Sequence, residues 1–253
     1  MTWATTSMIF PSTCMKARSW ALRACWARAV PSCWKRLFGA RTRESGTVTL
    51  KGKEIRNKST AEAIKNGFAL CTEERRFNGI FPDLGLDFNT AIAGIGNYTN
   101  KVGWLSTKKM TDGHPEDDST PCTPRRPSTK TKIRHLSGGN QQKVILGRWL
   151  LLNPDIFLLD DPTRGIDVGA KYEIYQLIFD LAKQNKGVII CSSEMPELLG
   201  ICDRVLVLSS GHLTGEYDLV HDREHATQEN NHGGCHQVRL IIGGNFNAEI
   251  QKN

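Results

Sequence analysis

The sequence lacks several features that would fix its class at once, and each absence excludes something. None of its eight cysteines forms a C-x-x-C pair, so the spacing supports neither a zinc site nor a redox motif. No apolar run approaches the roughly 20 residues needed to cross a bilayer, so we expect any membrane association to be peripheral or through partner subunits. The lack of a secretory signal is consistent with a reducing, cytoplasmic setting.

Acidic side chains are missing from the first 43 residues, and this segment accounts for the basic character of the chain. The net charge is +7, and residues 1–43 alone carry eight Lys or Arg. Subtracting these eight charges from the total leaves −1 for everything after Arg43. That near-neutral remainder lacks the basic footprint typical of DNA or RNA binding, so we expect no nucleic-acid partner.

Ordinary globular patterning covers about residues 45–110 and 131–218. Two runs, 156–159 and 187–191, are wholly apolar, as expected of buried strands in a parallel sheet. Strands alternating with helices predict an α/β fold with an open, largely parallel sheet. The predicted strands are 46–50, 68–72, 156–159, 187–191 and 204–208, and the predicted helices are 140–152, 172–183 and one beginning near Pro196.

Three stretches lack this patterning: residues 1–44, 111–130 and 221–253. The first contains four of the six Trp, three Cys and no periodic apolar face. A targeting presequence is one interpretation of it, but the density of Trp and Cys fits that poorly. For the other two stretches, a polar loop and a disordered tail are the plain interpretation, and out-of-frame translation is the alternative.

The genetic code favours out-of-frame translation of residues 1 to about 36. Read from the third base of each codon, Trp20-Ala21 must encode Gly, Cys25-Trp26 must encode Leu and Trp26-Ala27 must encode Gly. With the free bases filled, Ala21 to Arg36 can read G-V-A-G-L-L-G-A-G-R-T-E-L-L-E-T. That string contains G-x-x-G-x-G-R-T, the spacing of a phosphate-binding loop with Arg in place of the usual Lys.

The run Leu136 to Lys143, Leu-Ser-Gly-Gly-Asn-Gln-Gln-Lys, combines features that favour an anion. Ser137 can cap the following helix, and Gly138 and Gly139 let backbone N–H groups approach a phosphate closely. The helix N-terminus adds a partial positive charge. Three such residues alone would be read as an ordinary helix-capping loop, but an eight-residue motif followed by a second motif is a stronger signal.

The second motif is an apolar strand that ends in two carboxylates and a proline, Ile156 to Thr163. In open α/β sheets, ligands bind at the carboxyl ends of strands, which is where Asp160 and Asp161 fall. Asp160 is the predicted Mg²⁺ ligand, and Asp161 is predicted to orient or deprotonate an attacking water. A structural interpretation, in which Asp-Asp-Pro merely caps a helix, is reasonable only if the motif is taken alone.

These motifs, with Arg164-Gly165-Ile166-Asp167-Val168-Gly169-Ala170 after them, resemble the signature loop, Walker B and D-loop of ABC ATPases. The run Ser192 to Gly200 is similar to the second ATPase domain of the double-domain proteins that energise bacterial monosaccharide importers. Further runs, 68–76, 97–103 and 147–151, resemble the galactose/methyl galactoside branch. The resemblance covers about residues 45–110 and 132–218, and it implies a P-loop NTPase-like domain over 45–220. A helical subdomain would lie at roughly 83–150, and the N-terminal strand and P-loop would be lost.

The resemblance also implies roles for individual residues. Ser137, Gly138, Gly139 and Gln141 would contact ATP held mainly by a second ABC ATPase domain, arranged head to tail. Glu73 occupies the Q-loop position, where it would contact Mg²⁺ and relay to the permease. Asp167 belongs to the D-loop, and Ser193 occupies the switch-histidine position. The implied partners are integral-membrane permeases and, indirectly, a periplasmic sugar-binding protein, at the cytoplasmic face of the inner membrane.

Departures from the family pattern predict a weak or inactive ATP site on this half. Asp161 replaces the usual glutamate, and misplacing a catalytic group by about 1 Å can cost on the order of 10²-fold in rate. Ser193 cannot act as a protonatable switch. An ATPase that energises sugar import is therefore one hypothesis. The alternatives are an inactive half that only supplies its signature loop, a soluble non-transport ABC ATPase, and a product that does not fold stably.

Overall fold

The computed structural model describes residues 21–24, 30–43, 47–100, 104–106, 110, 130–209, 212–219 and 238–239. Most of the stretches 111–130 and 221–253 lie outside these residues. The chain forms two compact units. The sheet unit comprises Met1–Leu70, Asp155–Asp161 and Ile178–Asn253, and the helical unit comprises Cys71–Pro154 and Pro162–Leu177.

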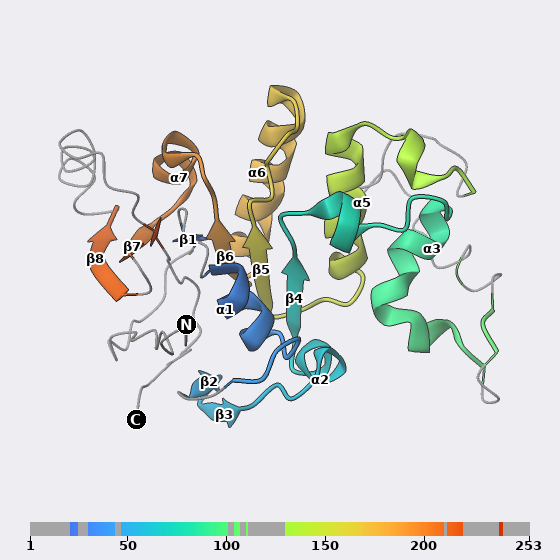
Figure 1. The fold of residues 1–253 in the computed structure, drawn as a ribbon, viewed down its shortest axis with the longest axis horizontal. Coiled ribbons are helices and arrows are strands. Elements are labelled where there is room, and N and C mark those ends of the chain that lie inside the picture. Colours follow the sequence, from blue (N-terminus) through green and yellow to red (C-terminus); the bar gives the residue numbers. More distant parts are fainter. Residues whose placement is uncertain are drawn as a thin grey trace, which may run out of the picture. The chain divides into compact units, whose positions relative to one another are not determined.

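A four-stranded sheet in the order β1-β6-β5-β4 forms the centre of the sheet unit (Figure 1). Its inner strands, β5 (Ile156–Asp160) and β6 (Gly187–Cys191), are buried along their whole length and pair in parallel. The register sets Asp160 beside Cys191, so the carboxyl ends of both strands meet at one edge. The predicted parallel α/β sheet is thus confirmed, with β4 (Phe68–Cys71) as one outer strand.

Two elements fall within residues 1–44, for which the sequence predicts an out-of-frame or disordered segment. β1 (Ala21–Ala24) pairs in parallel with β6, and α1 (Val30–Leu37) follows. Trp34, Leu37 and Phe38 are 1%, 9% and 6% exposed. Their spacing puts them on one helical face. This face is not evident from the sequence, because it is short and follows an unpatterned stretch.

Smaller elements complete the sheet unit. The hairpin β2 (Val48–Leu50) and β3 (Lys53–Ile55) turns at Lys51 and Gly52, both at positive φ, as a two-residue hairpin turn requires. α2 (Thr60–Lys65) is capped by the Ser59 side chain, which accepts a hydrogen bond from Glu62 N. α7 (Met195–Ile201) precedes an antiparallel sheet of β7 (Arg204–Ser209), β8 (His212–Asp218) and β9 (Val238–Arg239).

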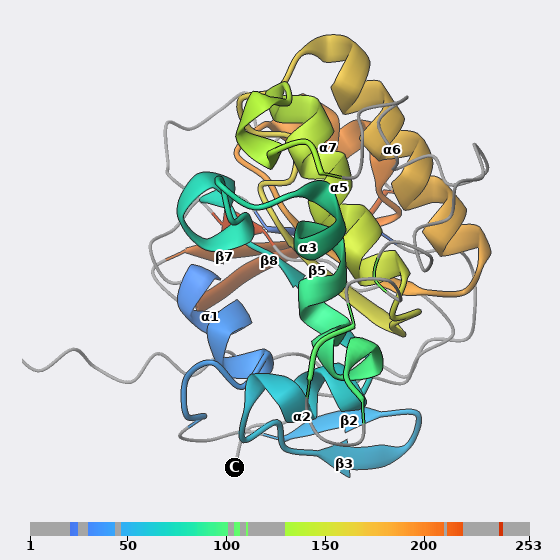
Figure 2. The same cartoon turned by 90° about the vertical axis from the view of Figure 1, so that its right-hand side faces the viewer.

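The helical unit contains α3 (Leu86–Ala91) and α5 (Gly138–Leu150), which lie side by side (Figure 2). Around them are η1 (Arg75–Gly79), η2 (Ile92–Tyr98), η3 (Ile133–His135) and the first part of α6 (Val168–Lys183). Asn89 is fully buried, and its amide binds the backbone of Phe81, Leu84 and Gly85. Arg148 Nε donates to Asn89 O at 2.6 Å, and burial lowers the pKa of Arg148 to about 10.

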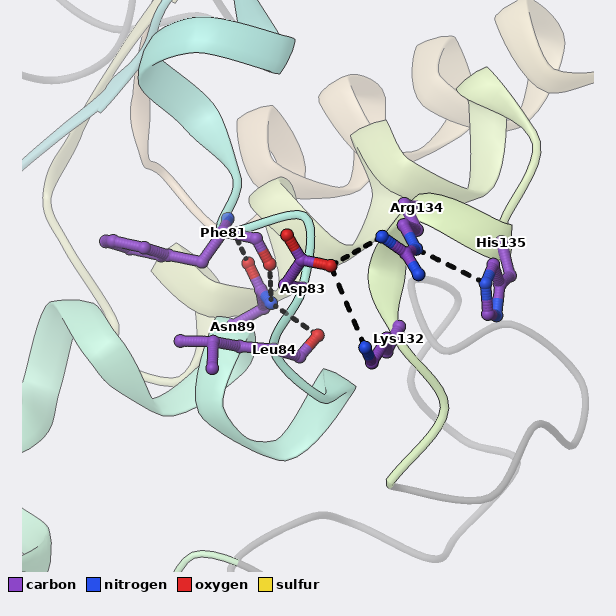
Figure 3. A network of polar contacts seen from close by, with 7 residues as sticks. All are labelled: Phe81, Asp83, Leu84, Asn89, Lys132, Arg134 and His135. Atoms are coloured by element: carbon purple, nitrogen blue, oxygen red, sulfur yellow. Dashed lines mark hydrogen bonds and ion pairs between the residues drawn. The ribbon is translucent and has the colours of Figure 1, made fainter.

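An exposed polar network joins the loop before α3 to the residues that lead into α5 (Figure 3). Asp83 Oδ1 lies 2.5 Å from Arg134 Nη1 and 3.7 Å from Lys132 Nζ, and Arg134 Nε lies 3.4 Å from His135 Nε2. Backbone contacts support the same junction, because Ile133 N donates to Leu84 O. Side-chain ion pairs and a backbone hydrogen bond therefore both connect the residues before the predicted signature loop to the loop before α3.

The predicted elements at 68–72, 140–152, 156–159, 172–183, 187–191 and 204–208 are confirmed within a few residues at each end. The short helices α2 and α3 were not predicted, since neither carries the two turns of periodic pattern that identify a helix from sequence. Among the described residues, no helix has the length and apolarity to span a membrane.

Candidate functional site

Asp160 and Asp161 lie at the carboxyl edge of the central sheet, where β5 ends. Asp160 is 7% exposed, because the strand that carries it is buried between its neighbours. Asp161 leaves the strand with φ at 46°, a left-handed conformation that Asp tolerates better than most residues, and its N–H donates to Cys191 O at 2.7 Å. Main-chain bonds thus fix the direction of both carboxylates.

Ser193 lies at the same edge, just after β6. Its Oγ donates to Asp161 Oδ2 at 2.9 Å, so the structure brings together the two residues predicted as water-orienting base and switch. The neighbouring Ser192 is buried, and its Oγ accepts a hydrogen bond from Glu194 N. The first residues after β6 therefore form a small hydroxyl-lined turn beside the carboxylates.

Burial dominates the electrostatics of this edge. It raises the pKa of Asp160 from 3.8 to about 6, against a lowering effect of the Cys191 thiol hydrogen bond. Burial also raises the pKa of Asp161, which the hydrogen bonds from Ser193 lower, and the nearby Glu197 and Glu194 raise it further. A buried carboxylate without a cation is costly, so this edge favours a positively charged ligand.

In the helical unit, the predicted signature loop forms the N-terminus of α5. Ser137 is exposed and caps the helix, and its Oγ accepts from Asn140 N at 3.4 Å. α5 is 13 residues long, so its first backbone N–H groups and its dipole form a regular anion-favouring end. The predicted helix cap is confirmed.

The two glycines of this loop have a second role that the sequence analysis missed. A Cβ on Gly138 would lie 2.6 Å from Arg75 Nη2 and 3.2 Å from Gly165 O. A Cβ on Gly139 would overlap Ala170 Cβ, in the first turn of α6. Close packing against the Arg75 and Ala170 side chains and the Gly165 carbonyl oxygen therefore favours glycine here, besides any approach of a phosphate.

Gln141 and Asp167 were both predicted to contact nucleotide, and both make local backbone contacts. Gln141 is 6% exposed, and its Nε2 donates to Leu136 O at 3.1 Å and to Ile133 O at 3.4 Å. Asp167 Oδ1 accepts from Ala170 N at 2.9 Å and so caps α6. Gln141 therefore contacts the backbone at the start of the signature loop and just before it, and Asp167 caps the N-terminus of α6. Their roles toward nucleotide stay predictions.

Glu73, the predicted Mg²⁺ contact, forms an ion pair with Arg164 in the helical unit. Two residues on, Arg75 donates from Nη1 to Arg164 O at 2.7 Å and from Nη2 to Gly165 O at 3.1 Å. Burial lowers the pKa of Arg75, and Arg76 lowers it further.

The predicted site residues therefore form two groups. Asp160, Asp161 and Ser193 gather in the sheet unit, whereas Glu73, Gln141, Asp167 and the Ser-Gly-Gly turn belong to the helical unit. No set of three His, Cys, Asp or Glu side chains suited to a metal occurs in the part of the chain that the structure describes. A pair of carboxylates does fit Mg²⁺ that is held largely by phosphates, which is how Mg²⁺ commonly binds in ATPase sites.

Comparison with known proteins identifies the class to which a chain with this fold and these motifs belongs. The family model described as ABC transporter matches residues 32–164, more than half of the chain. The chain therefore belongs to the ABC transporter family, and the matched residues include the predicted signature loop (136–143) and the predicted Walker B strand (156–160).

Two curated relatives of this chain carry the same name. The galactose/methyl galactoside import ATP-binding protein of Mannheimia succiniciproducens is 58% identical over 180 residues, which is 71% of this chain and 35% of the relative. Its counterpart from Escherichia coli K12 is 57% identical over 183 residues, or 72% and 36%. The chain thus spans about a third of the length of these relatives.

Solved structures agree on the fold. One is a dimeric post-hydrolysis state of an ATP-binding cassette bound to ADP and Pi, with a TM-score of 0.59 and 21% identity, covering 75% of this chain and 80% of that one. Another is the ADP conformation of a second cassette, with a TM-score of 0.60 and 18% identity, covering 79% and 82%. These likenesses support the ABC fold alone.

Proposed function

We propose that this chain is one ATPase half of a bacterial monosaccharide importer, of the galactose/methyl galactoside class, and that it completes an ATP site held mainly by a second ATPase domain. The exposed Ser137 cap at the N-terminus of α5 is the observation that carries the proposal. It presents a helix dipole and glycine N–H groups toward a phosphate. The relatives' identity of 57% and 58% supports the sugar class.

On its own side, the sheet unit retains the residues that would hold the cation of a nucleotide. Asp160 would bind Mg²⁺, and Asp161, held by Ser193, would orient water. The cation would supply charge neutralisation on the phosphates when bound. Asp161 has a shorter side chain than the glutamate of the family pattern, and Ser193 has no titration near neutral pH, so we expect slow or no hydrolysis at this side.

The segment after Glu73 supports a membrane-permease partner at the cytoplasmic face. Three apolar side chains there are exposed: Phe77 by 85%, Phe81 by 45% and Leu84 by 40%. Exposed apolar groups this close together are typical of a contact surface for another protein. A permease is the partner that the importer proposal requires, and a periplasmic sugar-binding protein would act through it.

We also propose that the N-terminal segment is read out of frame, which would explain a missing phosphate-binding loop. The frame-restored G-x-x-G-x-G-R-T falls on codons 24–31. It would run from the last residue of β1, through residues 25–29, to the first two residues of α1. A phosphate-binding loop of this type joins a strand to a helix N-terminus, so the register supports the proposal. Sequencing the gene decides it, since a single intact frame with the written codons would overturn it.

A complementation experiment tests the main proposal. The chain is mixed with an Escherichia coli relative whose own second ATPase domain has been deleted, and ATP hydrolysis is measured with each component alone and together. We expect hydrolysis to rise only in the mixture, and to rise far less with the variant Ser137→Arg, which puts a bulky cation at the cap. Hydrolysis by the chain alone, unaffected by Ser137→Arg, would instead favour an autonomous ATPase.

A further inference from the structure

In the helical unit, side-chain contacts join the segment 73–75 to the segment 164–165. Glu73 forms an ion pair with the Arg164 guanidinium. Arg75, in turn, donates to the carbonyl oxygens of Arg164 and Gly165 at 2.7 and 3.1 Å. We call these four residues the bracket. It holds the first two residues of the D-loop segment at three points.

The bracket also contacts the turn Ser137 to Gly139, which we call the signature turn. A Cβ on Gly138 would lie 2.6 Å from Arg75 Nη2 and 3.2 Å from Gly165 O, so the Arg75 side chain occupies the space beside this glycine. The next glycine, Gly139, packs directly on Ala170. The first turn of α5 and the segment leading into α6 therefore share one contact surface, and Arg75 contacts both.

Arginine suits this position better than any other side chain. Its planar guanidinium carries several N–H donors in a fixed fork, so two adjacent carbonyls can be bound at once. Gly165 has φ at 64°, a left-handed turn that favours glycine and lets both carbonyls accept from Arg75. A lysine at position 75 would keep the charge but lose the fork.

We propose that Arg75 is a positioning residue that holds the signature turn at 137–139 and the D-loop segment at 164–167 as one rigid body. Both would then present a fixed geometry to the same nucleotide. The identity of that nucleotide rests on the proposed function, but the mechanical coupling does not. Arg75 acts through the backbone of Arg164 and Gly165 and through its packing beside Gly138.

Hydrogen exchange measured by mass spectrometry on the full chain tests the coupling. We compare Arg75→Ala and Arg75→Lys with the wild type and with Arg76→Ala, which removes the same charge from an exposed neighbouring position. Exchange of the hydrogen-bonded amides that follow the two segments, those of Gln141 in α5 and of Ala170 and Lys171 in α6, should rise at least about tenfold in the two Arg75 variants, since a hydrogen bond to a charged group commonly shifts an equilibrium by that factor. Exchange in β5 and β6 should stay unchanged, which also shows that the variants fold. Arg76→Ala should match the wild type.

Gly138→Ala adds a second, independent arm. Its methyl group would displace the Arg75 guanidinium, so it should reproduce the exchange of Arg75→Ala. In the Arg75→Ala background the closest contact of the methyl is gone and Gly165 O at 3.2 Å remains, so adding Gly138→Ala should change exchange much less. A rise in only one segment, a uniform rise with a lower Tm, no rise, or full additivity of the two changes would overturn the coupling. None of these readouts needs ATP or a partner, so they succeed or fail separately from complementation.

Discussion

The two groups of predicted site residues are positioned in different ways. In the sheet unit, buried parallel strands and main-chain hydrogen bonds direct the carboxylates of Asp160 and Asp161. In the helical unit, Ser137 of the signature turn is exposed and Gly139 is buried, and the turn depends on the Arg75 side chain and on the absence of side chains at Gly138 and Gly139. The backbone at the carboxylate edge should therefore keep its fold when the side chains of Asp160 and Asp161 are changed. The packing of the signature turn, by contrast, should be disrupted by one added methyl group.

The largest effect that would sharpen this comparison is expected from Gly139→Ala. The new methyl would overlap Ala170 Cβ, and neither group is the flexible end of a long side chain. Overpacking of this kind typically lowers the free energy of unfolding by about 1–3 kcal/mol, although alanine is intrinsically the better helix former. Urea denaturation, followed by circular dichroism, measures the change.

Two further variants control for that measurement. A methyl group added at Gly200, in α7, would meet no atom within 4 Å, so Gly200→Ala should be neutral or slightly stabilising. Ala170→Gly removes the methyl that Gly139→Ala would strike, so the double variant should recover most of the lost stability. If Gly139→Ala proved as harmless as Gly200→Ala, the packing account of this glycine would be wrong.

An effect of comparable size is expected from the titration of Asp160 in metal-free protein. Its pKa is about 6 in the folded state and 3.8 as an ordinary value, so the folded state binds more protons between these pH values. Stability from this group should therefore fall as pH rises from about 4 to 6, by on the order of 1–3 kcal/mol, and stay reduced above that range. Tm measured across this range with a chelator present should show the loss.

Asp160→Asn supplies the matched control for the titration. The amide does not ionise, so the variant should lack this component of the pH dependence and should gain stability relative to the wild type as pH rises. Because the strand is fixed by main-chain bonds, the variant should keep the fold. Parallel pH profiles for the two proteins would show that Asp160 does not carry the raised pKa.

Much of the sheet could be predicted from the sequence, for physical reasons that also explain the omissions. β6, and β5 up to Asp160, are apolar runs next to turn residues, a pattern typical of buried strands in a parallel sheet. α1 was missed because its apolar face spans only Trp34, Leu37 and Phe38 after an unpatterned stretch. The short α3 depends on Asn89, whose buried amide makes contacts outside the helix that no local pattern reveals.

The candidate site shows the same division. The cap at Ser137 and the carboxylates at the end of β5 were predictable, because capping and strand ends are local features. The hydrogen bond between Ser193 and Asp161 was not predicted, because the family resemblance gives each residue a separate role and the two lie 32 positions apart in the sequence. Arg75 could not have been assigned, since its partners are 89 and 90 residues away in sequence and are backbone carbonyls that carry no residue signal.

The smallest effect is expected at the exposed network around Asp83, which tests whether side chains stabilise the helical unit equally everywhere. Asp83→Asn removes the charge that faces Arg134 and Lys132, whose side chains are 50% and 46% exposed. Exposed ion pairs contribute only about 0–1 kcal/mol, so Asp83→Asn should lower the free energy of unfolding by an amount in that range. The decrease should be smaller in high salt, because salt screens exposed charges. A loss of more than about 2 kcal/mol would contradict this view. It would mean that the network, and not only the packing at Gly139, holds the approach to the signature turn.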